Sequence, residues 1–252
     1  MRLPAPYLHL LMPLVLIAAF ASFADSDDVA VPPAVPQQIV YGHSVLGRPL
    51  VATILGSGPN VTLIGGGIHG NETSAPGVVE KLLAYLIANP AELDGYTVVF
   101  VPRVNPDGCA AGTRANAHGV DLNRNFPYDW APRRKGVRLS TGAMALSEPE
   151  ARGFVELLDR THPSKVVSVH WPLHTLVWSG ADGKSIALAM QRENHYAFTN
   201  DVGYPTPGSL GSYLNHARGI SCVTLELPRE SVDKAWRENR DALLAAIRFP
   251  GK

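Results

Sequence analysis

Short apolar runs rich in β-branched residues alternate along the chain with longer segments in which apolar residues recur at helical spacing. The short runs predict strands, because branched and aromatic side chains favour the pleated surface of a sheet. The expected strands are Leu50–Leu55, Val61–Ile64, Thr97–Val101, Lys165–Val169 and Ser221–Leu225, and the expected helices are Gly77–Ala88, Pro149–Arg160, Lys184–Thr199 and Val232–Phe249. This alternation predicts a single-domain α/β fold, with a mixed central sheet covered by helices on both faces.

The first two dozen residues differ in kind from the rest of the chain. A lone Arg2 precedes an apolar stretch from Leu8 to Phe20. The small-residue sequences Ala19-Phe20-Ala21 and Ser22-Phe23-Ala24 offer cleavage after Ala24 or Ala21. This arrangement is typical of a secretion signal. An uncleaved membrane anchor is the alternative, but a spanning helix needs about 20 apolar residues and Pro13 interrupts this run. We therefore expect residues 1–24 to be a signal peptide.

The composition changes after the expected signal peptide. Residues 25–38 carry Asp-rich and Pro-rich patches and predict a flexible lead-in, so the folded domain is expected over residues 39–252. An exported protein meets an oxidising compartment, where the two cysteines of the chain, Cys109 and Cys222, can pair in a disulfide. The sequence is equally compatible with two buried thiols.

Composition and charge narrow the range of partners. The chain has 252 residues, of which 46% are hydrophobic, and this is enough for one large core. Its 22 basic residues balance 22 acidic residues. With no net charge it lacks the electrostatic signature of nucleic-acid binding or of an anionic membrane surface. We expect neither partner after signal cleavage, and the sequence does not indicate an oligomeric state.

Two histidines and a glutamate follow the predicted strands. His69 and Glu72 lie just after the apolar run Val61–Ile68, and His170 directly follows Lys165–Val169. In open α/β sheets, ligands bind beyond the carboxyl ends of the strands, so these side chains can converge. Two histidines and a glutamate leave one coordination position open, which is characteristic of a catalytic zinc. The sequence predicts a zinc hydrolase with one Zn²⁺ per chain, although a surface His–Glu pair would have the same spacing.

Further motifs accompany these three residues over nearly the whole chain after Tyr41. They are Asn105-Pro106-Asp107-Gly108, Asp121-Leu122-Asn123-Arg124-Asn125-Phe126 and the strand-borne Glu226. As a set, these motifs and the three predicted ligands resemble the zinc carboxypeptidase family. The resemblance implies that residues 39–252 are a catalytic domain. It also implies that Glu226 is the general base that deprotonates a zinc-activated water.

The resemblance assigns roles to four residues between the first and the third predicted ligand. Arg114 resembles the arginine that stabilises the oxyanion, and Asp121 resembles the carboxylate that orients a ligand histidine. Asn123 and Arg124 resemble the pair that binds the free α-carboxylate of the substrate, for which a guanidinium fork is well suited. A purely structural ion pair between Asp121 and Arg124 is the alternative.

The resemblance also concerns the substrate. Within the family, the chain is most similar to bacterial amidases of peptidoglycan turnover, which implies cleavage between γ-D-glutamate and meso-diaminopimelate in a peptidoglycan-derived peptide. With the predicted export, the reaction would take place in the periplasm. Residues 171–178 depart from those amidases, because they carry tryptophans in place of an acidic stretch. Tyr204 resembles the tyrosine that caps the bound substrate, or it packs on the surface as a loop aromatic.

Two other functions remain open at this point. One is a carboxypeptidase that removes an apolar C-terminal residue from ordinary peptides, which the tryptophans of residues 171–178 would suit. The other is a peptide-binding protein that has lost catalysis. The second is disfavoured because the predicted ligands and Glu226 are all present.

Overall fold

The computed structural model describes residues 35–132 and 139–251, so the predicted signal peptide lies outside it and stays a prediction. No helix in the described ranges is long and apolar enough to cross a membrane. The elements in chain order are β1 (Gln37–His43), β2 (Pro49–Gly56), β3 (Asn60–Gly66), α1 (Ser74–Ala88), η1 (Pro90–Leu93), β4 (Tyr96–Val101), α2 (Pro106–Ala111), η2 (Leu122–Arg124), α3 (Pro149–Thr161), β5 (Lys165–His170), β6 (Thr175–Ser179), α4 (Gly183–Asn194), β7 (Ala197–Thr199), α5 (Leu210–Arg218), β8 (Ser221–Glu226) and α6 (Val232–Arg248).

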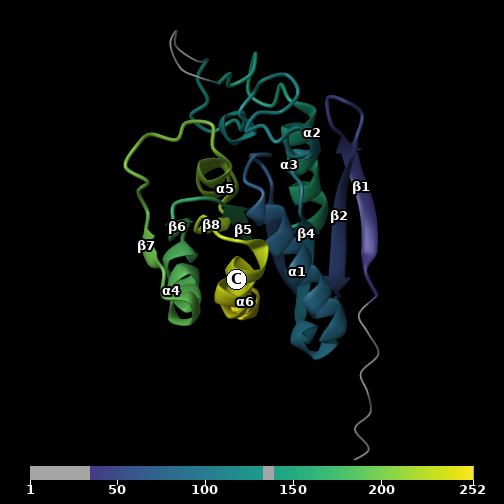
Figure 1. Ribbon diagram of the computed structural model, residues 1–252, viewed down its shortest axis with the longest axis vertical. Coiled ribbons are helices and arrows are strands. Elements are labelled where there is room, and N and C mark those ends of the chain that lie inside the picture. The colour runs from purple at the N-terminus through teal and green to yellow at the C-terminus, as the bar shows by residue number, and fades with distance from the viewer. Residues whose placement is uncertain (1–34, 133–138, 252) are drawn as a thin grey trace, which may run out of the picture. The chain divides into compact units, whose positions relative to one another are not determined.

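The strands of the described residues form one mixed sheet in the order β1-β2-β4-β3-β5-β8-β6-β7 (Figure 1). The four central strands β4, β3, β5 and β8 run parallel to one another. At one edge β1 and β2 add antiparallel neighbours, and at the other edge β6 runs antiparallel to β8. The predicted α/β fold with a mixed central sheet is confirmed.

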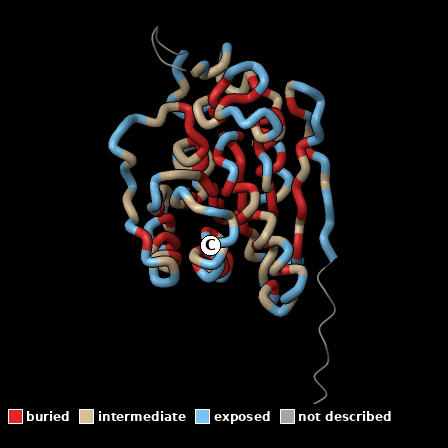
Figure 2. Tube along the Cα trace, in the orientation of Figure 1, coloured by how far each residue is buried: buried red, intermediate tan, exposed pale blue. Residues whose placement is uncertain are grey.

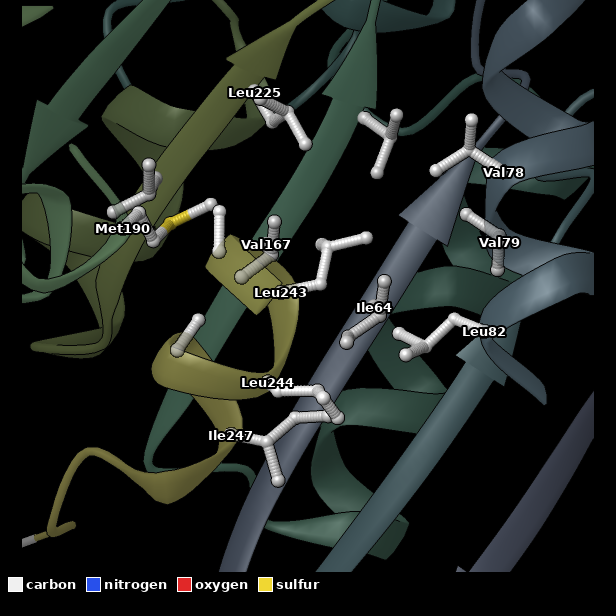
Figure 3. Packing of buried hydrophobic residues seen from close by; sticks show 14 of the residues in the cluster. Ile64, Val78, Val79, Leu82, Val167, Met190, Leu225, Leu243, Leu244 and Ile247 are labelled. Carbon is white, nitrogen blue, oxygen red and sulfur yellow. The ribbon is translucent and has the colours of Figure 1, made fainter. Parts of the chain in front are cut away.

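Helices cover both faces of this sheet, and the strand residues alternate between two hydrophobic clusters. Ile64 and Val167 pack with residues of α1, α4 and α6 (Figure 3), whereas Leu63 and Val166 pack with residues of α3 and α5. The central strands are accordingly buried along most of their length (Figure 2). Each buried aliphatic side chain contributes roughly 1.5–3 kcal/mol relative to an exposed one. Packing on both faces fixes the positions of the central strands, and with them the carboxyl ends of β3, β5 and β8.

Two sequence-based expectations are wrong at the edges of the sheet. The predicted helix over residues 184–199 is instead α4, which ends at Asn194, followed by the short strand β7. His195 closes α4 in the left-handed region with φ 58°, and β7 then pairs with β6. Of the lead-in expected over residues 25–38, residues 25–34 lie outside the described ranges, and Gln37 and Gln38 belong to β1 because they pair with β2. Both errors involve short segments whose structure depends on a neighbouring strand.

The two cysteines are free thiols. Cys222 is buried in β8, and the Cys109 Sγ on α2 donates to the carbonyl of Gly67 at 3.6 Å. Burial raises the pKa of Cys109 to about 11 and that of Cys222 to about 12. Since the thiolate is the reactive form, neither cysteine is a nucleophile at neutral pH.

Candidate metal centre and active site

The predicted metal ligands lie at the carboxyl ends of two neighbouring parallel strands. His69 follows β3 in a tight turn in which the Glu72 amide donates to the His69 carbonyl at 3.1 Å. His170 is the last residue of β5, the strand next to β3. The turn requires glycine at position 70, because a Cβ there would lie 1.9 Å from the backbone carbon of Gly108. Strand pairing and this close approach together bring the three side chains to one place.

The His69, Glu72 and His170 side chains form a buried group whose candidate ligand atoms all lie within 4.8 Å of one another. The Nδ1 atoms of the two histidines lie 2.7 and 3.1 Å from the two carboxylate oxygens of Glu72. The other ring nitrogens have partners outside the group. Asp121 Oδ1 lies 3.1 Å from Nε2 of His69, and Ser168 Oγ lies 3.1 Å from Nε2 of His170. This leaves both Nδ1 atoms for a metal, and the donor set fits an open zinc site.

The charge state of the carboxylates suits this arrangement. Burial alone would raise the pKa of Glu72. The charge of His170 and its hydrogen bond to Glu72 act in the opposite direction, as do those of His69, and they hold the pKa of Glu72 at about 2. Burial opposes ionisation of Asp121 as well, but its contacts with His69 and the nearby Arg114 keep its pKa below the ordinary range. Both carboxylates are therefore ionised at neutral pH, as metal binding and histidine orientation require.

Glu226 ends β8 and pairs in register with His170 on the neighbouring strand β5. Its side chain is 9% exposed, and its Oε2 accepts a hydrogen bond of 3.4 Å from the Leu173 amide. Burial raises its pKa above the ordinary range. A carboxyl group of raised pKa beside a metal group is suited to take up and release a proton during a reaction.

Arg114 links the metal group to Asp121. Its Nε donates to Asp121 Oδ2 at 3.1 Å, and its Nη1 lies 3.5 Å from Glu72 Oε1. The alternative ion pair between Asp121 and Arg124 is absent from the described residues, since Asp121 pairs with Arg114 and His69 instead. The Arg114 side chain is 39% exposed and lines the pocket. Its guanidinium is therefore held by Asp121 and is still accessible to a molecule in the pocket.

Asn123 and Arg124 lie on η2 and line the same pocket. The Asn123 side-chain oxygen accepts from the Leu210 amide at 2.9 Å and so holds the first turn of α5. Arg124 Nη1 donates to the Asn123 carbonyl at 2.6 Å. In residues 35–132 and 139–251 no carboxylate pairs with Arg124, so its charge is available for an anion.

These side chains line one pocket, except for Asp121, which is not part of the lining and contacts His69 Nε2. Tyr204, on the loop before α5, lines the pocket and is 55% exposed. No ring contact involves Tyr204 among the described residues, which fits a rim position rather than a packed surface aromatic. The pocket is lined by the predicted residues His69, Glu72, Arg114, Asn123, Arg124, His170, Tyr204 and Glu226.

A buried His–Glu–His group, a second carboxylate and two arginines in one pocket are the parts that zinc-dependent amide hydrolysis needs. The sequence profile described as zinc carboxypeptidase matches residues 30–177, which include all three candidate ligands. This chain belongs to the zinc carboxypeptidase family. Its members are hydrolases that depend on zinc.

Individual relatives cover most of this zinc carboxypeptidase. Over 229 residues it is 37% identical to murein peptide amidase A of Escherichia coli (strain K12). This alignment covers 84% of this chain and 90% of the relative. The crystal structure of murein-tripeptide amidase MpaA from Escherichia coli O157 matches with a TM-score of 0.69 at 31% identity, covering 86% and 94% of the two chains. Carboxypeptidase A from Helicoverpa armigera matches with a TM-score of 0.74 at 19% identity, covering 85% and 68%, which shows a shared fold.

Sequence reasoning did not single out Ser168. It lies two residues before His170 on β5, so the two side chains share one face of the sheet, and this alternation could have found it. If His170 held a metal through Nδ1, its Nε2 would carry the proton and would donate to Ser168 Oγ. Ser168 is thereby placed to fix the ring orientation of this zinc carboxypeptidase ligand.

We expect Ser168→Ala to weaken zinc binding roughly 10-fold, because the ligand histidine loses the partner that orients its ring. Competition with a chromogenic chelator measures the zinc affinity directly. Ser179→Ala is the matched control, since Ser179 lines the same pocket without contacting a ligand. An unchanged affinity of the Ser168 variant would show that the Ser168 hydroxyl does not orient His170.

Proposed function

We propose that this zinc carboxypeptidase hydrolyses the amide between γ-D-glutamate and meso-diaminopimelate in peptidoglycan stem peptides. The observation that carries the proposal is the unpaired Arg124 guanidinium in the same pocket as the His–Glu–His group and Glu226. A cation at this place suits a substrate with a free carboxylate next to the scissile bond. The similarity to murein peptide amidase A over most of both chains supports the choice of peptide.

The catalytic steps follow from the positions of the side chains. Zinc held by His69, Glu72 and His170 would polarise the scissile carbonyl and lower the pKa of a water. The Glu226 carboxylate accepts one proton from the water as its oxygen bonds to the carbonyl carbon, and passes this proton to the amide nitrogen as the C–N bond breaks. The products are an amine and a carboxylic acid, which exchange the remaining proton to give an ammonium and a carboxylate at neutral pH. Because its pKa is raised by burial, Glu226 holds this proton more readily than an exposed carboxylate would.

The arginines act on the two charges of the substrate. Arg114 is oriented by Asp121 and donates to the oxygen on which negative charge develops, which lowers the barrier to the tetrahedral intermediate. Arg124 and the side-chain amide nitrogen of Asn123 bind the α-carboxylate of the residue to be released. This contact positions the amide bond and sets the direction from which the peptide enters.

A carboxypeptidase for apolar C-terminal residues is the second candidate, because Trp171, Val177 and Trp178 line the pocket. The purified protein separates the candidates when it is given L-Ala-γ-D-Glu-meso-diaminopimelate and, separately, an acylated dipeptide ending in phenylalanine. We expect release of diaminopimelate with zinc and no release after treatment with a chelator. Release of phenylalanine alone would reject the amidase proposal, and activity that survives chelation would reject the metal mechanism.

A further inference from the structure

The pocket continues along the sheet, away from the catalytic residues. His170 and Glu226 form one row across β5 and β8. Two residues back along these strands, Ser168 and Thr224 form a second row, which Val177 of β6 extends. All five side chains line the pocket. Since two residues of a strand span roughly 7 Å, the pocket extends by at least that length beyond the catalytic row.

The segment after β7 forms part of the pocket wall at the end away from the catalytic row. β7 runs parallel to β6 with Thr199 opposite Val177, so the chain leaves β7 pointing away from the catalytic row. The next residues, Asn200 and Asp201, line the pocket, as does Ser179 at the end of β6. A substrate side chain that starts at the scissile amide and lies along the second row therefore ends near Asp201.

Asp201 brings an uncompensated charge to this end. The acidic side chains that line the pocket are Glu72, Glu226 and Asp201, of which the first two belong to the metal group and the catalytic row. One oxygen of Asp201 accepts from the Gly203 amide at 2.7 Å, and the side chain is exposed. Within the described ranges Asp201 forms no ion pair. Its second oxygen is free to accept a hydrogen bond from a bound molecule.

The other walls of the far end are neutral. Ser179, Thr224 and Ser212 carry hydroxyl groups, and Val177 adds an aliphatic side chain. The pocket therefore has two arginines near the catalytic row and one carboxylate at the opposite end. This distribution fits a ligand with an anion close to the scissile bond and an amino group near the end of its side chain. The carboxylate that shares the distal carbon with this amino group in diaminopimelate would face the neutral hydroxyl groups instead of Asp201.

We propose that Asp201 binds the side-chain amino group of the residue released by hydrolysis, so that the pocket selects a diamino acid. The inference rests on the proposed function and specifies which part of the substrate that pocket recognises. It also accounts for the absence of acidic residues from residues 171–178. The carboxylate comes from the loop after β7, which lines the same pocket from a different part of the chain.

The variant Asp201→Asn tests the assignment, because an asparagine oxygen can still accept from the Gly203 amide while the charge is lost. The two substrates are L-Ala-γ-D-Glu-meso-diaminopimelate and the analogue ending in L-2-aminopimelate, which lacks the distal amino group. We expect kcat/KM for the diaminopimelate peptide to fall roughly 10-fold, mainly through KM, with no loss for the analogue, whose distal group is a carboxylate alone. Asp94→Asn is the matched control, since Asp94 is exposed and outside the pocket.

Two results would overturn the assignment. One is an equal loss on both peptides, which would make Asp201 a structural residue of the loop, and the other is an unchanged kcat/KM for the diaminopimelate peptide. If the unmodified protein cleaves neither γ-D-glutamyl peptide, the proposed function itself fails and the assignment of Asp201 fails with it. The behaviour of the unmodified protein thus distinguishes failure of the function from failure of this inference alone.

Discussion

Replacement of Glu226 by glutamine is expected to lower kcat by roughly 10²–10⁴-fold while zinc remains bound. Glutamine has nearly the same shape and can still accept from the Leu173 amide, but it cannot take a proton from water. Because Glu226 is not in the His–Glu–His group, the substitution leaves the three candidate ligands intact. Steady-state kinetics on the diaminopimelate tripeptide, with metal analysis of the same sample, measures both quantities.

The control for this experiment is Glu156→Gln, which makes the same chemical change on an exposed position of α3. This variant should keep the kcat and the zinc content of the unmodified protein. If the Glu226 variant retains its turnover, another group must act as the base. If instead it loses zinc together with activity, Glu226 supports the metal group rather than the proton transfer.

Removal of the Arg114 side chain is the second change with a large expected effect. We expect Arg114→Ala to lower kcat by roughly 10²–10³-fold, with a smaller change in KM, because the guanidinium acts on charge that exists only in the transition state. Arg114→Lys should recover only part of the rate. A lysine ammonium keeps the charge but cannot hold Asp121 while it also presents a second nitrogen to the substrate.

Kinetics with zinc-loaded protein separates this role from simple binding. Arg103→Ala serves as the control, since Arg103 pairs with Glu80 outside the pocket and its side chain is 49% exposed. A loss confined to KM would show that Arg114 holds the substrate in its ground state. It would then be a second carboxylate-binding residue and not a stabiliser of the oxyanion.

The central strands could be predicted because burial on both faces leaves a continuous apolar run in the sequence. Val61–Ile64 and Lys165–Val169 are such runs, and they form β3 and β5. The edges could not be predicted in this way. Thr175–Ser179 is only partly buried, and β7 has three residues that become a strand by pairing with β6. Such segments lack a periodicity that is long enough to separate strand from helix or loop.

The same distinction applies to the site. His69, Glu72 and His170 were accessible to sequence reasoning because each of them follows a recognisable strand or its turn. Asp201 was not, since its position in the pocket depends on the pairing of β7 with β6. The hydrogen bond from the Leu210 amide to the Asn123 side chain could not be predicted either, because a local sequence pattern does not indicate which distant helix a side chain contacts.

The order of strands in the sheet has a consequence for when the enzyme becomes active. β5 lies between β3 and β8, and β8 with Glu226 comes from the last part of the chain. A growing polypeptide therefore carries its metal ligands well before its base. We therefore expect polypeptides that end before β8 to lack hydrolase activity, because they lack Glu226.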